Sequence, residues 1–170
     1  VSLEAEGLLP STIEQLYPAE IPGESGFDND AVQLHNVKIP VLKYIDCLDY
    51  ALRVFDQNEV ARQRVLGFTE KPEKLSHERA AQILTGFLDR ADRGYRNSED
   101  RQLVFAAWEE ASGNRSAYQA LLQAMKVALL SPGFLHRMEE TKDSSEPYQV
   151  TANELAVRLS YFLWSSMPDA

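Results

Sequence analysis

The spacing of apolar residues beyond position 40 most limits what this chain can fold into. Between Ser116 and Ser131 the apolar residues recur at helical spacing, and they are Tyr118, Leu121, Leu122, Met125, Ala128 and Leu129. Similar stripes follow Pro40, Ser76 and Ser98. Each stripe is too narrow to be stable alone, so we expect an all-α fold: a small helical bundle with an irregular N-terminal lead-in.

Polar residues mark where these helices begin. Ser76 precedes one stripe as an N-cap, and the stripe after Ser98 is expected to include Leu103 and Trp108. Thr151 and Glu154 form the pattern of a capping box, in which each side chain satisfies a free backbone amide at a helix start. A last helix is therefore expected to begin there.

Two stretches lack a helical pattern. Residues 1–38 carry three prolines and three glycines, which allows at most one short helix around residues 12–17. Residues 58–75 carry scattered charges, Gly67 and Pro72, so we expect a connector with an extended piece at Val65 to Phe68.

Charge and composition exclude several classes of partner. The 170 residues carry a formal charge of -9, which repels a phosphate backbone, so nucleic acid is not an expected partner. No uninterrupted apolar run approaches the length needed to cross a bilayer. The single cysteine, Cys47, cannot form a disulfide within the chain and falls on a side of its helix that is expected to be buried.

Three segments resemble one protein family. They are Ser-Gly-Phe-Asp-Asn-Asp at 25–30, Val-Ala-Leu-Leu-Ser-Pro-Gly-Phe-Leu-His-Arg-Met-Glu at 127–139, and Glu-Leu-Ala-Val-Arg-Leu-Ser-Tyr-Phe-Leu-Trp-Ser-Ser-Met-Pro-Asp at 154–169. These strings resemble large planctomycete and myxobacterial proteins that carry the domain-of-unknown-function 1592 family with its neighbours 1587 and 1595.

The resemblance implies a division of the chain. Residues 1–57 are similar to the end of the 1587 segment, 76–139 to the 1595 segment, and 148–170 to the start of the 1592 domain, with 58–75 as the connector. It also implies an exported, periplasmic protein with a cytochrome-c-like domain and in some cases a carbohydrate-binding-like module. We therefore expect the chain to be a fragment of a larger protein.

Few residues suggest chemistry within the chain itself. It lacks the Cys-x-x-Cys-His motif that attaches haem c, so we expect no cofactor within this chain. The family resemblance implies haem c elsewhere in the full-length protein. His136 lies within a family-like string and is the one candidate to face a docked haem. Asp28, Asn29 and Asp30 cluster oxygen atoms that suit a hard cation, although ordinary turn formation is the favoured explanation of these residues.

Other polar and aromatic groups have structural explanations. Arg90, Arg93 and Arg96 lie near the end of a helix, where cations complement the macrodipole. This role in helix termination is favoured over an anion-binding site. Tyr161 and Trp164 leave the last helix apolar on more than one side, which predicts an interface with another domain of the same polypeptide.

Three hypotheses of function remain open. The first is a non-catalytic helical connecting module of a large exported, haem-associated protein. The second is a part of a periplasmic redox or polymer-degrading enzyme, with His136 or the loop at Asp28 to Asp30 contributing to its active site. The third is carbohydrate recognition in the full-length protein.

Overall fold

The computed structural model describes residues 41–93, 98–136, 139 and 147–164, and within these ranges all regular structure is helical. The expected all-α fold is confirmed. The chain forms two compact units, Val1–Arg64 and Val65–Ala170, which divide inside the stretch predicted to be a connector. The lead-in and the loop of Asp28, Asn29 and Asp30 lie outside the described residues.

The first unit contains α3 (Val41–Gln57) and most of α4 (Glu59–Leu66). The expected extended piece at Val65 to Phe68 is wrong, since α4 continues through Leu66. The physical reason is local, because the Asn58 side chain accepts a hydrogen bond from the Ala61 amide at 2.9 Å and caps a new helix. Gly67, with φ of +80°, then ends that helix in the left-handed region that glycine adopts without strain.

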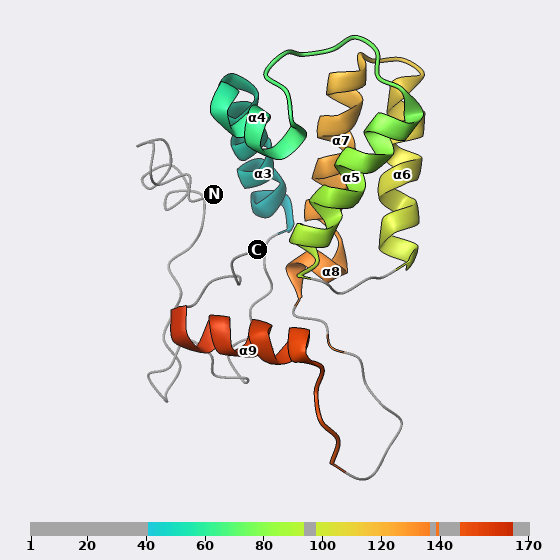
Figure 1. Ribbon diagram of the computed structural model, residues 1–170. Coiled ribbons are helices and arrows are strands. Elements are labelled where there is room, and N and C mark those ends of the chain that lie inside the picture. The colour runs from blue at the N-terminus through green and yellow to red at the C-terminus, as the bar shows by residue number, and fades with distance from the viewer. Residues whose placement is uncertain (1–40, 94–97, 137–138, 140–146, 165–170) are drawn as a thin grey trace. The chain divides into compact units, whose positions relative to one another are not determined.

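The second unit is built on α5 (His77–Ala91), α6 (Ser98–Ser112) and α7 (Ala117–Leu129), which pack side by side (Figure 1). The N-caps of α5 and α7 are present in the structure. Ser76 accepts from the Arg79 amide, and Ser116 forms a capping box with Gln119.

One apolar core joins these three helices. Its members include both large and small buried side chains, among them Ala80, Leu84, Leu88, Val104, Trp108, Tyr118, Ala120, Leu121, Ala124, Met125 and Ala128. The alanines of α7 allow close approach of α6, because a small side chain lets two helix backbones lie near each other. Leu103 was expected in this core but is 62% exposed, because the buried side of α6 runs through Val104 and Trp108.

Two further helices complete the second unit. The short α8 (Pro132–Leu135) follows α7 directly, with Ser131 as its N-cap and Pro132 in the first turn, as the sequence predicts. The last helix, α9 (Ala152–Trp164), begins at the predicted capping box, where Thr151 and Glu154 exchange hydrogen bonds of 2.7 and 3.2 Å.

Candidate functional site

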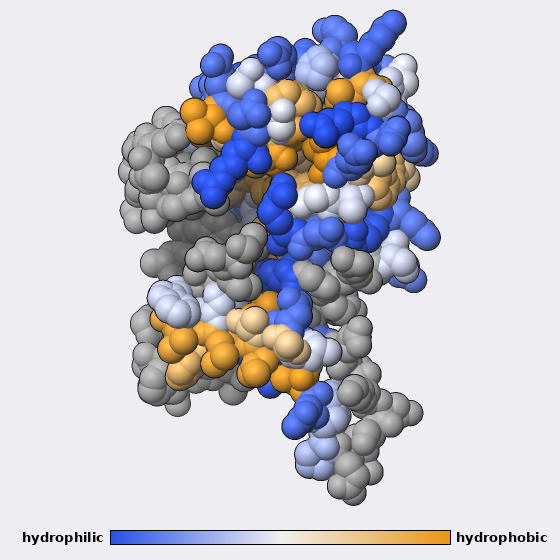
Figure 2. Space-filling view, in the orientation of Figure 1, coloured by the Kyte–Doolittle hydropathy of each residue, from blue (hydrophilic) through white to orange (hydrophobic). Residues whose placement is uncertain are grey.

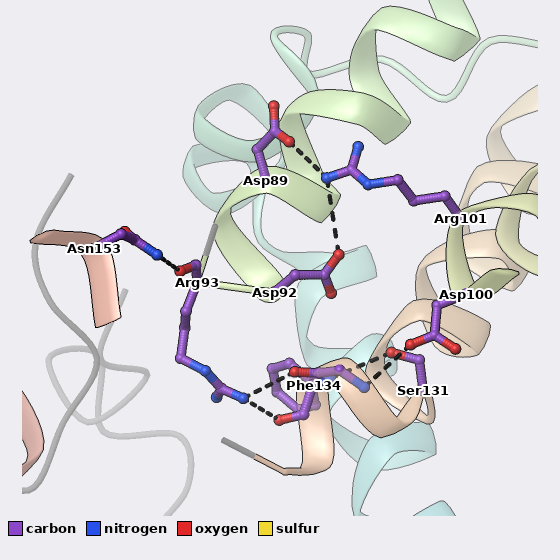
Figure 3. Close-up of polar contacts among 9 residues, drawn as sticks. Asp89, Asp92, Arg93, Asp100, Arg101, Ser131, Phe134 and Asn153 are labelled. Carbon is purple, nitrogen blue, oxygen red and sulfur yellow. Dashed lines mark hydrogen bonds and ion pairs between the residues drawn. The ribbon is translucent and has the colours of Figure 1, made fainter. Parts of the chain in front are cut away.

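The most concentrated group of polar contacts lies where α5 ends, and Arg93 is at its centre (Figure 3). Arg93 has φ of 53°, a left-handed conformation that is uncommon for a residue with a side chain. The Arg93 guanidinium donates through Nη2 to the carbonyl oxygens of Gly133, Phe134 and His136 at 2.9, 2.9 and 2.7 Å. Carbonyls at the end of a helix lack partners within it, so Arg93 supplies the donors that α8 needs.

The same arginine holds α9. Its Nη1 lies 3.3 Å from the hydroxyl of Tyr161, and its backbone carbonyl accepts from the Asn153 side chain at 2.7 Å. An ion pair also joins α9 to Glu139, where Arg158 Nε donates to Glu139 Oε1 at 2.7 Å. We call Arg93 with its partners on α8 and α9 the Arg93 latch, because one side chain joins three segments that are distant in sequence.

Carboxylates and a second arginine lie beside the latch. Asp100 on α6 is 5% exposed and accepts from the amide of Gly133 at 3.2 Å. Arg101 donates to Asp89 at 2.6 Å and lies 3.9 Å from Asp92. Burial raises the pKa of Asp92 above its ordinary value; Arg101 and Arg93 oppose the rise, and Asp100 and Asp89 add to it.

The histidine singled out from the sequence has a different role. The His136 side chain is exposed, and the structure uses its backbone carbonyl, as an acceptor for Arg93. His77 is also exposed and its ring meets Trp108 edge to face at 5.1 Å, whereas His35 lies outside the described residues.

Metal-binding and thiol chemistry gain no support from the described ranges. No three His, Cys, Asp or Glu side chains among the described residues form a group that could hold a metal ion. Cys47 is buried, and burial, with a smaller effect of Asp46, raises the pKa of its thiol. A raised thiol pKa lowers the fraction of reactive thiolate at neutral pH.

The residues predicted to form an interface lie on the side of α9 that carries Asn153. The hydroxyl of Tyr161 meets Arg93 within the same unit, so this side chain is half-buried. Trp164, one turn further along that side, is 71% exposed. Trp164 is therefore the more exposed residue of this pair.

The other side of α9 is apolar and exposed. Figure 2 shows apolar side chains gathered along this helix, and the exposed members are Leu155, Leu159, Phe162 and Leu163. Phe162 is 83% exposed. We call these four residues the α9 stripe, and with Trp164 they are the largest group of exposed apolar side chains that one described helix carries.

Sequence reasoning missed the burial of Asp92 and Asp100, although a signal was present. Asp92 continues the four-residue spacing of Leu84 and Leu88, and Asp100 stands four residues before Val104. An acidic residue at a core position of an apolar stripe indicates a buried polar group rather than a solvated one.

Comparison with known proteins gives no assignment, since no family model, no curated protein and no solved structure matches the chain. The resemblance of residues 127–139 and 154–169 to the family named above therefore stays an expectation. Among the described residues, none of the helices combines the length and the apolar character needed to cross a membrane.

Proposed function

We propose that this chain is a non-catalytic helical connecting module of a larger exported, haem-associated protein, in which it positions other domains of the same polypeptide. The exported and haem-associated context comes from the family resemblance alone. The connecting role has separate support in α9, which offers the α9 stripe to solvent while its other side is fastened to the second unit.

The polar groups beside α9 support a structural role. The guanidinium of Arg93 is engaged by carbonyl oxygens of α8, and the Asp100 carboxylate is engaged by a backbone amide. Arg101 is engaged by Asp89. These side chains join helices to one another, which is what a module that sets the position of its neighbours requires.

The spacing of the α9 stripe indicates the shape of its partner. Leu155, Leu159 and Phe162 recur at four and three residues, which places them in one row along the helix. A row at this spacing fits between the side-chain ridges of a second helix. The partner is therefore expected to present an apolar helix face.

The size of the stripe favours a partner within the same polypeptide. From their exposed fractions, the four stripe residues and Trp164 offer roughly 400 to 600 Å² of apolar surface. A stable interface between separate chains buries about 800 Å² on each partner. A tethered domain needs less, because its effective concentration at the site reaches about the millimolar range.

The test compares hydrogen exchange of α9 in the native full-length protein and in residues 1–170 alone. We expect slower exchange of α9 amides in the full-length protein, because the partner covers the stripe. Leu159→Asp should remove that extra protection, since it places a carboxylate in the contact. Leu103→Asp is the matched control, because Leu103 is an exposed leucine on α6 outside the stripe.

Two results would contradict the proposal. One is equal exchange of α9 in both proteins, which would mean that nothing covers the stripe. The other is loss of protection in Leu103→Asp as large as in Leu159→Asp. Concentration-dependent dimerisation of residues 1–170 that Leu159→Asp abolishes would instead identify a second copy as the occupant.

A further inference from the structure

Asp92 is the least compensated charged group that the structure describes. It is the C-terminal cap of α5 and is 2% exposed, yet neither of its carboxylate oxygens has a hydrogen-bond donor among the described residues. Ionisation of a buried carboxyl that has no hydrogen-bond donors is strongly unfavourable. Burial without donors therefore favours the neutral form of the Asp92 carboxyl.

The nearest cations do not satisfy it. Arg101 Nη2 is 3.9 Å from Asp92 Oδ2, beyond hydrogen-bond range, because the same nitrogen donates to Asp89 at 2.6 Å. The Arg93 guanidinium points to the carbonyl oxygens at the end of α8 (Figure 3). Both arginines therefore stabilise the ionised form of Asp92 only by electrostatic attraction, without donating a hydrogen bond to it.

Anions face Asp92 from two elements. Asp89 lies one turn earlier on α5, and Asp100 comes from α6. Within the described part of α8, Gly133 contributes backbone and no titratable side chain. With Arg93 and Arg101, these are the charged groups of the described residues that act on Asp92.

Gly133 brings the two buried carboxylates to one place. A Cβ atom at Gly133 would lie 3.1 Å from Asp100 Oδ2 and 3.5 Å from Asp92 Oδ1. Both carboxylates therefore approach the same residue, and only Asp100 accepts its amide hydrogen, at 3.2 Å. When two carboxylates share a buried site, ionising the second costs much more than ionising the first.

We infer that the junction of α5, α6 and α8 is a pH-sensitive element, in which protonation of the buried Asp92 carboxyl governs how firmly the Arg93 latch holds α9. The effect of Asp92 protonation on folding stability does not depend on the proposed function. Its effect on a docked domain does rest on the proposed function, because the α9 stripe is the surface proposed to dock.

The structure gives the route of the coupling. While Asp92 is neutral, it does not repel the Asp100 carboxyl, which accepts the hydrogen bond of the Gly133 amide. Ionisation of Asp92 adds a buried charge that is relieved when the end of α5 opens to water. Arg93 is the next residue, so the same opening displaces its guanidinium from α8 and from Tyr161.

The sign of the pH dependence follows from the raised pKa of Asp92, which burial causes first and Asp100 and Asp89 strengthen against Arg101 and Arg93. For an acid whose pKa is higher in the folded state, the contribution to stability is fully present below the ordinary Asp pKa of 3.8. That contribution is lost as the pH rises through the pKa of the folded state.

The experiment measures urea unfolding of the 170-residue chain from pH 4 to pH 8, followed by the fluorescence of buried Trp108 in a Trp164→Phe background. We expect the unfolding equilibrium constant of the wild type, divided by that of Asp92→Asn, to rise with pH. The same ratio for Glu110→Gln, which removes an exposed carboxylate of α6, should stay constant. A ratio for Asp92→Asn that is flat or falls with pH would overturn the inference.

Two further readouts separate the parts of the inference. The carboxyl ¹³C shift of Asp92 in the wild type should titrate above that of an unfolded control, and it needs no variant to fold. Exchange of α9 amides, corrected for intrinsic rates, should accelerate with pH in the wild type and not in Asp92→Asn. Exchange that is equally pH-independent in both would overturn the coupling to α9. Because the isolated chain has no docked domain, these results do not depend on the test of the proposed function.

Discussion

Replacing Arg93 with alanine tests the latch most directly. The substitution removes one guanidinium nitrogen that contacts three carbonyl oxygens at 2.7 to 2.9 Å. That nitrogen carries two hydrogens, so it makes the equivalent of two charge-assisted bonds, each worth about 1.5 to 3 kcal/mol. Arg93 is half-buried and water replaces part of the loss, which brings the expected cost down to about 2 kcal/mol.

The loss should appear in α9 before it appears in the core. A 13-residue helix is marginal in water alone, so the amide protection of α9 depends on its attachment. A loss of about 2 kcal/mol corresponds to about thirtyfold faster exchange of α9 amides in the isolated chain. The fluorescence of Trp108 should report a much smaller change, because Trp108 lies in the core of α5, α6 and α7.

Two companion variants isolate the cause. Arg93→Gly removes the same guanidinium but relieves the left-handed backbone at φ of 53°, so it should be about 1 kcal/mol more stable than Arg93→Ala. Arg90→Ala removes an exposed arginine three residues earlier on α5 and should leave exchange unchanged. If Arg93→Ala leaves α9 exchange at the wild-type rate, or if Arg90→Ala accelerates it equally, the latch does not hold α9.

Two other expectations have separate measurements. Ser116→Ala removes the capping box of α7, so urea unfolding should show a loss of about 1 kcal/mol, and an unchanged midpoint would contradict the cap. The proposed haem-associated function predicts that alanine at His77 or His136 in the full-length protein leaves the haem spectrum unaltered, and loss of a Soret band in either variant would favour the redox alternative over the connecting module.

Helix starts were predictable because their chemistry is local. Ser76, Ser116 and Thr151 each bond to an amide three residues away, so the sequence contains both partners. The start of α4, which lies within the expected connector, has the same local signal, since the Asn58 side chain accepts from the amide of Ala61. That start was missed because α4 is short and strongly charged, so its apolar stripe is weak.

The partners of the buried polar groups were not predictable from local pattern. Asp100 stands at a core position of its stripe but also looks like a first-turn acid that favours the helix dipole, and its acceptor role depends on the amide of Gly133, 33 residues away. Arg93 likewise looks like a helix-terminating cation, but its partners lie 40 to 43 residues further along the chain. Contacts at such separations depend on how helices pack.

The orientation of α9 links the polar junction to the proposed function. A surface helix of an isolated domain normally turns its apolar side inward, whereas α9 is fastened by Asn153, Tyr161 and Arg158 and turns the α9 stripe outward. Polar contacts of this kind contribute about 1 kcal/mol each, so the helix is held in place without using its hydrophobic free energy. In the proposed function that free energy is available to a docking domain, and the strength of the Arg93 latch decides how well ordered α9 is beforehand. Protonation of Asp92, which we infer to keep the latch closed, then lowers the entropic cost of docking.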